Sequence, residues 1–254
     1  MATKKDTEIS VLEINTCTIP FCIVGNSPLI LNRMSEKVKG QLLLPPAKKN
    51  AAEKASTLKH EPLVEFQAAA YKDPDESAPT LLRHLATAFK GALRSAALDI
   101  PGASKSQVGR LTYVNGDYVS VFGIPKLLMS VTRSADINRT PDVRTRVIVP
   151  EWAACLSVTF VKPLLREQTV ANLFAAAGIM QGVGDWRPGK GSGTYGQFRL
   201  VNADDPDYLR IMAEGGRAAQ EAAMDQAEPY DVESEELLAW FGVEAARRGF
   251  KVVA

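Results

Sequence analysis

A glycine-rich stretch around residue 185 constrains the fold of this chain more than any other feature. Residues 175–201 read AAAGIMQGVGDWRPGKGSGTYGQFRLV. So many glycines leave the backbone free to take positive φ and to approach a ligand closely. Trp186, Arg187 and Lys190 lie among them, and cations in such a loop favour an anion, most simply a phosphate. A helix-like run precedes the loop, and a strand-like segment follows it.

Two other interpretations apply to a stretch of this kind. Gly184 to Lys190 has the spelling G-x-x-x-x-G-K of a nucleotide-binding P-loop, but Gly191 stands where that motif needs Ser or Thr. A P-loop also follows a strand and opens a helix, whereas this loop follows a helix and opens a strand. We therefore expect no P-loop. A loop that merely turns the chain stays open as an alternative.

Composition bounds the class of protein. A chain of 254 residues with 46% hydrophobic residues can form one large domain, or one domain with appendages. It has no apolar run long enough for a transmembrane helix and no apolar signal-peptide core, so we expect a cytoplasmic protein without membrane contact. Cys17, Cys22 and Cys155 lack metal-ligand spacing and there are only two histidines. We expect reduced, mostly buried thiols, no metal site and no cofactor.

Charge is unevenly distributed along the chain. Residues 1–203 contain 25 Lys and Arg against 17 Asp and Glu, whereas residues 204–254 contain 5 against 12. A basic body with an acidic C-terminal tail indicates a polyanionic partner for the body. The tail could shield that surface or dock on a neighbouring copy, or it could be an ordinary solvated helical face.

The order of elements predicts the fold class. Apolar periodicity and turn signals predict strands at 8–24, 126–132, 143–149, 155–161 and 195–201, a hairpin at 111–122, and helices at 79–99, 167–178, 206–226 and 234–248. This is an α+β, ferredoxin-like (RRM-like) β-α-β-β-α-β core. It carries long insertions, including a basic one at 34–78, and a helical C-terminal tail in which Ser234 is the expected N-cap.

One helix carries a family resemblance. FKGALRSAA at Phe89–Ala97 resembles a helix of the RAMP superfamily, the RNA-binding subunits of CRISPR effector complexes. The Ser27-Pro28-Leu29 strand end before it and the glycine-rich loop at Gly182–Leu200 after it are also similar. Asn32-Arg33 resembles an Asn-Arg pair of some backbone subunits. The resemblance covers residues 8–201, and Gly182–Phe198 also resembles uncharacterised phage and prophage proteins with a GVGxWRPxK-G-xxGxF signature.

The resemblance implies a protein that assembles in several copies along single-stranded nucleic acid, with RNA favoured over DNA. Partners would be further copies, as a homo-oligomer or filament, and other subunits of a nucleoprotein complex. Cations contact the nucleic-acid backbone, and aromatic rings stack on bases; Trp186 could instead be a core-capping ring. The candidate contact residues are Asn32, Arg33, Lys37, Lys48, Lys49, Lys90, Arg94, Arg139, Arg144, Arg146, Trp186, Arg187, Lys190 and Tyr195.

Catalysis is not expected. Some members of the superfamily cleave RNA with an aspartate in the loop after the first strand, but residues 25–40 contain only Glu36 as an acid. General acid–base chemistry needs positioned partners, and Asp136 and Asp185 have none nearby in sequence. Two alternatives remain open: a metal-dependent nuclease of the same fold that uses Glu36, Asp136 or Asp185, and a phage assembly or interaction protein that binds protein.

Overall fold

A four-stranded antiparallel sheet forms the centre of the molecule. The computed structural model describes residues 11–34, 36–44, 58–133 and 141–250. The strand order of the central sheet is β10-β1-β9-β5, and each neighbouring pair is antiparallel. Its strands are β1 (Asn15–Gly25), β5 (Thr112–Val114), β9 (Ala153–Lys162) and β10 (Phe198–Val201).

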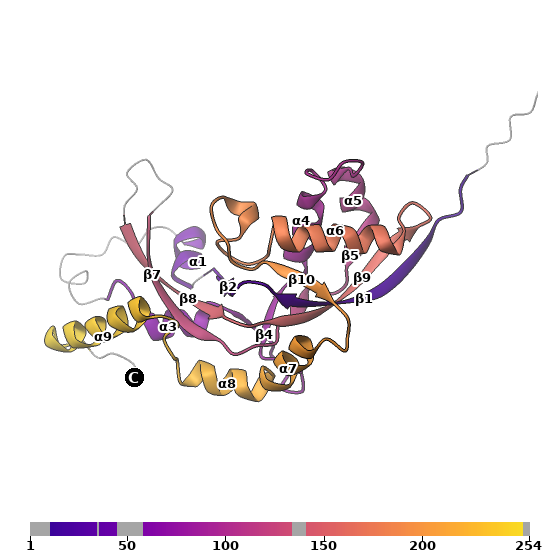
Figure 1. The fold of residues 1–254 in the computed structure, drawn as a ribbon. Coiled ribbons are helices and arrows are strands. Elements are labelled where there is room, and N and C mark those ends of the chain that lie inside the picture. The colour runs from indigo at the N-terminus through magenta and orange to yellow at the C-terminus, as the bar shows by residue number, and fades with distance from the viewer. Residues whose placement is uncertain (1–10, 35, 45–57, 134–140, 251–254) are drawn as a thin grey trace, which may run out of the picture.

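Two helices, α4 (Ala86–Ala96) and α6 (Glu167–Met180), cover one face of this sheet (Figure 1). The strands of this sheet and the two helices come in the chain order β1, α4, β5, β9, α6, β10, with other elements inserted between them. The last strand therefore lies beside the first, and the third lies between the first and the second. This arrangement is the β-α-β-β-α-β unit of a ferredoxin-like fold, so the predicted fold class is confirmed.

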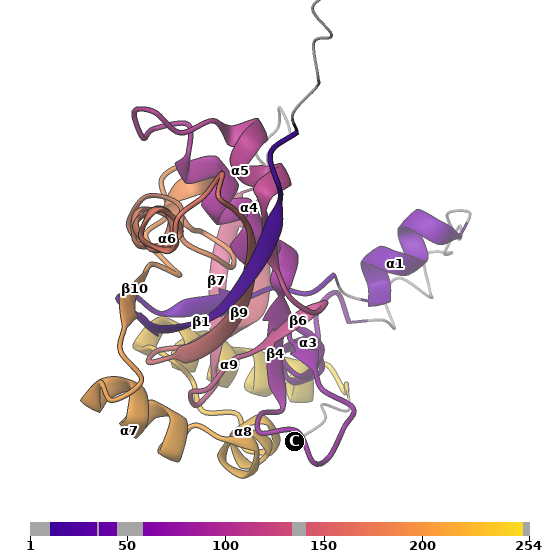
Figure 2. The same cartoon turned by 90° about the vertical axis from the view of Figure 1, so that its right-hand side faces the viewer.

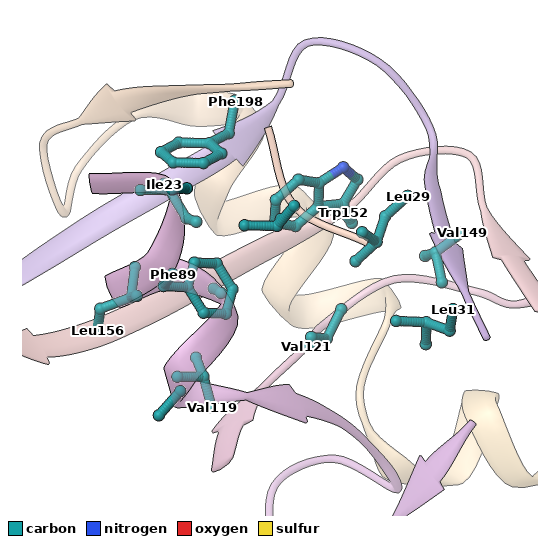
Figure 3. Close-up of a cluster of buried hydrophobic side chains, with 14 of the residues drawn as sticks. Ile23, Leu29, Leu31, Phe89, Val119, Val121, Val149, Trp152, Leu156 and Phe198 are labelled. Carbon is teal, nitrogen blue, oxygen red and sulfur yellow. The ribbon is translucent and has the colours of Figure 1, made fainter. Parts of the chain in front are cut away.

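The main core lies between the central sheet and these helices. Alternate residues of a strand point to opposite faces, so Phe21 and Ile23 of β1 face inward and meet Phe89 and Phe174 from the two helices. Figure 3 shows how Phe89, Ile23 and Leu156 converge with Trp152 and Phe198. Trp152 is fully buried and donates its indole N–H to the carbonyl of Ser27 at 2.9 Å.

Two smaller antiparallel sheets extend this core. One has the order β2-β8-β7 and the other the order β3-β4-β6. Their strands are β2 (Leu29–Leu31), β7 (Lys126–Arg133), β8 (Pro141–Val149), β3 (Tyr71–Lys72), β4 (Leu82–Leu85) and β6 (Tyr118–Ser120). Strand predictions at 126–132, 143–149 and 155–161 are confirmed to within a few residues by β7, β8 and β9.

Two sequence predictions in the middle of the chain are wrong. The helix expected over 79–99 begins only at Ala86, because residues 82–85 form β4 and pair with β6. The expected hairpin at 111–122 is also absent, although Gly116 turns the chain at φ 79°. Its two arms pair elsewhere, β5 with β9 and β6 with β4, so this turn connects two sheets.

The remaining described helices lie in the insertions, in the glycine-rich loop and in the C-terminal tail. They are α1 (Glu36–Leu43), α3 (Pro62–Ala68), α5 (Lys105–Leu111), the short η1 (Pro188–Lys190), α7 (Pro206–Glu214), α8 (Arg217–Asp225) and α9 (Val232–Arg247). Part of the basic insertion is integral to the fold, since Phe66 of α3 is fully buried in the main core. None of the helices described is long and apolar enough to cross a membrane.

The acidic tail winds along the body (Figures 1 and 2). Tyr208 and Ile211 of α7 pack on the outer face of the central sheet. The single helix expected over 206–226 is two helices, because the chain turns at Gly215, whose backbone approaches Gly123 too closely for any side chain. α9 begins after Asp231, which accepts the N–H of Ser234 at 2.8 Å.

The role of Ser234 and the burial of Cys155 both differ from what the sequence predicts. Ser234 is not the N-cap of α9; it is fully buried, accepts the Met129 N–H and joins α9 to β7. Cys155 is exposed, and Cys17 and Cys22 are partly buried, so the thiols are less buried than predicted. Cys155 stands on the outer face of β9, directly opposite Cys22 of β1.

Candidate nucleic-acid interface

The glycine-rich loop, residues 182–196, lies on the edge of the β2-β8-β7 sheet. The Asp185 N–H donates to the Ile30 carbonyl at 2.9 Å, and the Gly196 N–H donates to the Pro28 carbonyl at 2.8 Å. The loop is closed by a bond from Tyr195 N–H to the Trp186 carbonyl at 3.1 Å. It connects α6 to β10, as its sequence context predicts.

Glycine is required at two positions of this loop. A Cβ on Gly196 would overlap the carbonyl of Val183, and its φ is 69°. A Cβ on Gly193 would overlap the carbonyl of Trp186. Only glycine allows such close backbone approach, so these residues fold the loop back on itself and fix where its side chains point.

Asp185 is the centre of a polar cluster that we call the Asp185 cluster: Asn32, Arg146, Asp185 and Lys190. Asn32 Nδ2 donates to Asp185 Oδ2 at 3.0 Å. Arg146 Nε lies 3.2 Å from the same oxygen, and Lys190 Nζ lies 3.5 Å from Oδ1. Burial raises the pKa of Asp185, but Arg146, Asn32 and Lys190 outweigh it and hold that pKa below its usual value. Asp185 is therefore ionised at neutral pH; it accepts a hydrogen bond from Asn32 and forms ion pairs with Arg146 and Lys190.

Arg146 is the buried member of this cluster. Only 2% of its side chain is exposed, and the Asp185 side chain is 12% exposed. Its guanidinium lies 4.5 Å from the centre of the Trp186 ring and donates to Ser130 Oγ at 3.3 Å. Burial lowers the pKa of Arg146, Asp185 opposes this shift, and Arg144 adds to it. Asp185 compensates the charge of Arg146, and the Arg146 guanidinium packs against the Trp186 ring.

Trp186 forms the half-buried aromatic surface of the site. It packs with Tyr195 and Tyr230 against a patch of Ile30, Leu128 and Ile148. The Trp186 and Tyr195 ring centres are 6.1 Å apart. Trp186 also has a φ of 50°, a left-handed conformation that costs a non-glycine residue about 1–2 kcal/mol. Such strain persists where the surrounding contacts require it, and it concentrates at functional sites.

Arg187 points into the body. Its Nη1 donates to the Gly184 carbonyl of its own loop at 2.8 Å. Its charge acts on His84 of β4. Burial lowers the pKa of His84 to about 4, and Arg187 adds a smaller effect in the same direction. His84 Nε2 has no solvent contact and no hydrogen-bond partner among the described residues. The geometry thus ties Arg187 to the loop backbone.

The other predicted contact residues lie at several places. Arg144 is exposed on β8, on the same strand face as Arg146. Lys90 of α4 lies 4.6 Å from the Tyr113 ring centre, and the alkyl part of Arg94 lies against α5. Arg33 lies over Tyr71 at 5.6 Å. The side chain of Lys37 and the residues Lys48, Lys49 and Arg139 lie outside the described residues.

Sequence reasoning missed Asp185 as an organising residue and Tyr230 as part of the aromatic surface. Asp185 and Asn32 are 153 residues apart, so no local spacing could reveal their contact. Tyr230 comes from the acidic tail and reaches this patch where its N–H donates to the Leu127 carbonyl of β7 at 2.8 Å. In the part of the chain that is described, no group of three or more His, Cys, Asp or Glu residues could hold a metal ion.

No protein-family model and no curated protein matches this chain. Among solved structures it is similar to a chain of the type III-B Cmr-beta bound to cognate target RNA. That match has a TM-score of 0.39 and 14% identity and covers 74% of this chain and 59% of that chain. Cmr6 from Pyrococcus furiosus is similar with a TM-score of 0.35 and 10% identity, over 74% and 98% of the two chains. This chain spans less than two thirds of the Cmr-beta chain.

Proposed function

We propose that this protein binds single-stranded nucleic acid, with RNA favoured, and that the surface formed by the glycine-rich loop is a principal contact. The observation that carries the proposal is the aromatic surface of Trp186, held from below by Arg146 and bordered by the exposed Lys190. Proteins that bind single strands combine cations along the backbone path with aromatic side chains on which bases stack.

Each residue of the site has a separate role in this proposal. Lys190, 64% exposed at the loop tip, and the exposed Arg144 contact phosphates, which needs charge and little directionality. Trp186 and Tyr195 offer ring faces to bases. Arg146 and Asp185 position Trp186, and Arg187 holds the loop backbone. Asn32 supplies an amide beside the same carboxylate.

The proposed role is non-catalytic. Asp185 is the acid of the loop, and its two oxygens are already occupied by Asn32, Arg146 and Lys190. A carboxylate held by two cations is a weak base, since its pKa is depressed. The metal-dependent nuclease predicts cleavage of RNA in Mg²⁺ or Mn²⁺, and a denaturing gel of RNA incubated with the protein distinguishes the two roles.

Assembly in several copies along the strand, as a subunit of a larger nucleoprotein complex, belongs to the same proposal. It comes from the RAMP resemblance and from the uneven charge of the chain. Light scattering of the protein with RNA of increasing length tests it, because a subunit that assembles along the strand adds copies as the strand lengthens. A mass of one copy per RNA at every length would reject it.

Fluorescence anisotropy with labelled single-stranded RNA and DNA of equal length, titrated across salt, tests the binding proposal. Affinity should fall as salt rises, and Lys190→Ala should reduce the salt slope by about 0.7, the contribution of one phosphate contact on a single strand. Lys162→Ala is the matched control, because Lys162 is an exposed lysine at the far end of β9. Absence of binding to either strand at low salt would refute the proposal.

A further inference from the structure

Two cysteines of the central sheet, which we call the cysteine pair, face each other across neighbouring strands. Cys22 of β1 is directly opposite Cys155 of β9 in the antiparallel register. Directly opposite residues lie on the same face of a sheet, and here it is the outer face, where Cys22 packs against the cluster that contains Tyr208 of α7. Figure 1 shows α7 on the opposite side of β1 and β9 from α4 and α6.

The hydrogen-bond pattern brings the two backbones close together at the cysteine pair. The Gly25 N–H donates to the Trp152 carbonyl at 2.8 Å, between the two chain segments. The next residue, Ala153, exchanges both of its backbone hydrogen bonds with Phe122, on the side that faces away from β1. Hydrogen-bonded and non-hydrogen-bonded pairs alternate along an antiparallel ladder. The register is continuous, so the cysteine pair, like the pair at Ala153, is non-hydrogen-bonded.

A disulfide fits such a position. Directly opposite Cα atoms of a non-hydrogen-bonded pair are about 4.5 Å apart, and the Cα atoms of disulfide-bonded cysteines are about 4.4–6.8 Å apart. A bridge therefore needs rotation of the two side chains and no movement of either strand.

Cys17 is unable to join either thiol of the pair. It precedes Cys22 on β1, and a rise of about 3.3 Å per residue separates their Cα atoms by roughly 16 Å. Residues an odd number of positions apart on a strand point to opposite faces, and Cys17 packs against the main core. The three cysteines of the chain therefore allow one bridge within the molecule, between Cys22 and Cys155.

The two thiols of the pair differ in access to solvent. Cys155 is exposed, whereas Cys22 is partly buried and the neighbouring Tyr208 is buried. Burial raises the pKa of the Cys155 thiol, Cys22 adds to this shift, and Tyr208 opposes part of it. Because the thiolate is the reactive form, Cys155 reacts slowly at neutral pH and faster as the pH rises.

We infer that the cysteine pair is an oxidation site that closes to a disulfide when a peroxide is present. The Cys155 thiolate attacks one oxygen of hydrogen peroxide and breaks the O–O bond, which leaves a sulfenic acid; the departing hydroxide takes up the thiol proton and becomes water. The Cys22 thiol then attacks that sulfur, the S–O bond breaks, and a second water leaves with the Cys22 proton. The two sulfurs lose two electrons, and the two peroxide oxygens gain them.

The bridge has a consequence for stability. It closes a loop that contains every element from β2 to β8, and a disulfide that closes a long loop lowers the entropy of the unfolded chain. Oxidised protein should therefore melt about 5 °C or more above reduced protein. The inference needs no nucleic acid, so it stands or fails separately from the proposed function.

Peptide mapping of the full chain tests the inference. Trypsin leaves Cys17 and Cys22 on one peptide, so Cys17→Ala provides a protein in which only the cysteine pair remains. This protein is freed of reductant, exposed to hydrogen peroxide, alkylated with iodoacetamide and digested. A crosslinked peptide that joins Cys22 to Cys155 is expected. It should form faster at pH about 9 than at pH about 7, and dithiothreitol should remove it by thiol–disulfide exchange.

Cys22→Ser and Cys155→Ser are the matched controls, since each removes one partner and leaves the other thiol in place. Neither should melt at a higher temperature after oxidation, whereas Cys17→Ala should show the same rise as wild type. Disulfide-linked dimers as the main product on a non-reducing gel would overturn the inference. So would sulfinic acid on Cys155 with Cys22 still alkylated, because the second thiol would then have failed to reach the first.

Wild-type protein gives a measurement that needs no variant. After denaturation, iodoacetamide should modify all three thiols of the reduced protein but only that of Cys17 in the oxidised protein. Three alkylated thiols after prolonged oxidation would reject the site even if Cys17→Ala failed to fold. A melting temperature that falls on oxidation would also reject it, because the bridge would then distort the sheet.

Discussion

Acid should destabilise this fold through His84. Burial, with a smaller effect of Arg187, lowers the pKa of His84 to about 4, whereas a histidine in an unfolded chain titrates near 6.5. Between these pH values His84 binds a proton in the unfolded chain but not in the folded protein. The free energy of unfolding is therefore fully retained above pH about 6.5 and falls as the pH drops toward 4.

The size of this effect follows from the two pKa values. At about 1.36 kcal/mol per pKa unit, the full interval is worth about 3 kcal/mol, and about 2.5 kcal/mol is lost by pH about 4.5. That is a large share of the roughly 5–15 kcal/mol typical of folded proteins. The cause is that His84 Nε2 is sealed from solvent without a hydrogen-bond partner among the described residues.

Urea unfolding of wild type and His84→Leu, at pH values from about 7 to about 4.5, measures the effect. Carboxylates titrate in both proteins, so the difference between them isolates His84, and wild type should lose about 2.5 kcal/mol more than the variant. His60→Gln is the control, since His60 contacts the carboxylates of Glu65 and Asp142 and lies in another part of the structure. A wild-type-to-variant difference that stays constant across this range would refute the reasoning.

Three further substitutions test the packing. Gly178→Ala should destabilise by about 1–3 kcal/mol, because its Cβ would overlap the Phe198 carbonyl. At Gly91 a Cβ would meet nothing within 4 Å, so Gly91→Ala should stabilise its helix by about 0.5–1 kcal/mol. Equal melting temperatures for Gly178→Ala and Gly91→Ala would contradict both predictions. Gln220→Ala should lower the free energy of unfolding by at least about 3 kcal/mol, because buried Gln220 accepts the Leu82 N–H and donates to three carbonyls. Urea titration measures this loss, and a loss below about 1 kcal/mol would contradict that role.

The elements that sequence predicts well are those whose pattern is set locally. α6 and β9 have clear apolar periods, so their predicted bounds nearly match the observed ones. The predicted start of α4 is wrong because of contacts between residues that are distant in the chain. Leu81 and Leu82 fit a helical apolar pattern, but their N–H groups bond to the side chain of Gln220, 139 and 138 residues away. No window of sequence contains that partner.

The candidate site shows the same division. Composition drew attention to the glycine-rich loop, and the loop does bring Trp186, Tyr195 and Lys190 together on one sheet. What sequence could not show is that Arg146 and Arg187, both predicted to contact nucleic acid, make contacts within the protein instead. Arg146 is drawn under the loop by an ion pair, and Arg187 turns to the Gly184 carbonyl. The Arg146 contact joins segments that are distant in the chain, whereas the Arg187 contact lies within the loop.

The pairing of β1 with β9 has a consequence for how the chain is made. Thr18 and Thr159 hydrogen bond across these strands at 2.7 Å although 141 residues separate them. At a synthesis rate of about 5–20 residues per second, β1 leaves the ribosome roughly 7–28 s before its partner exists. During that time β1 has no native neighbour strand on the side of β9, so the apolar face of Phe21 and Ile23 stays exposed until β9 emerges.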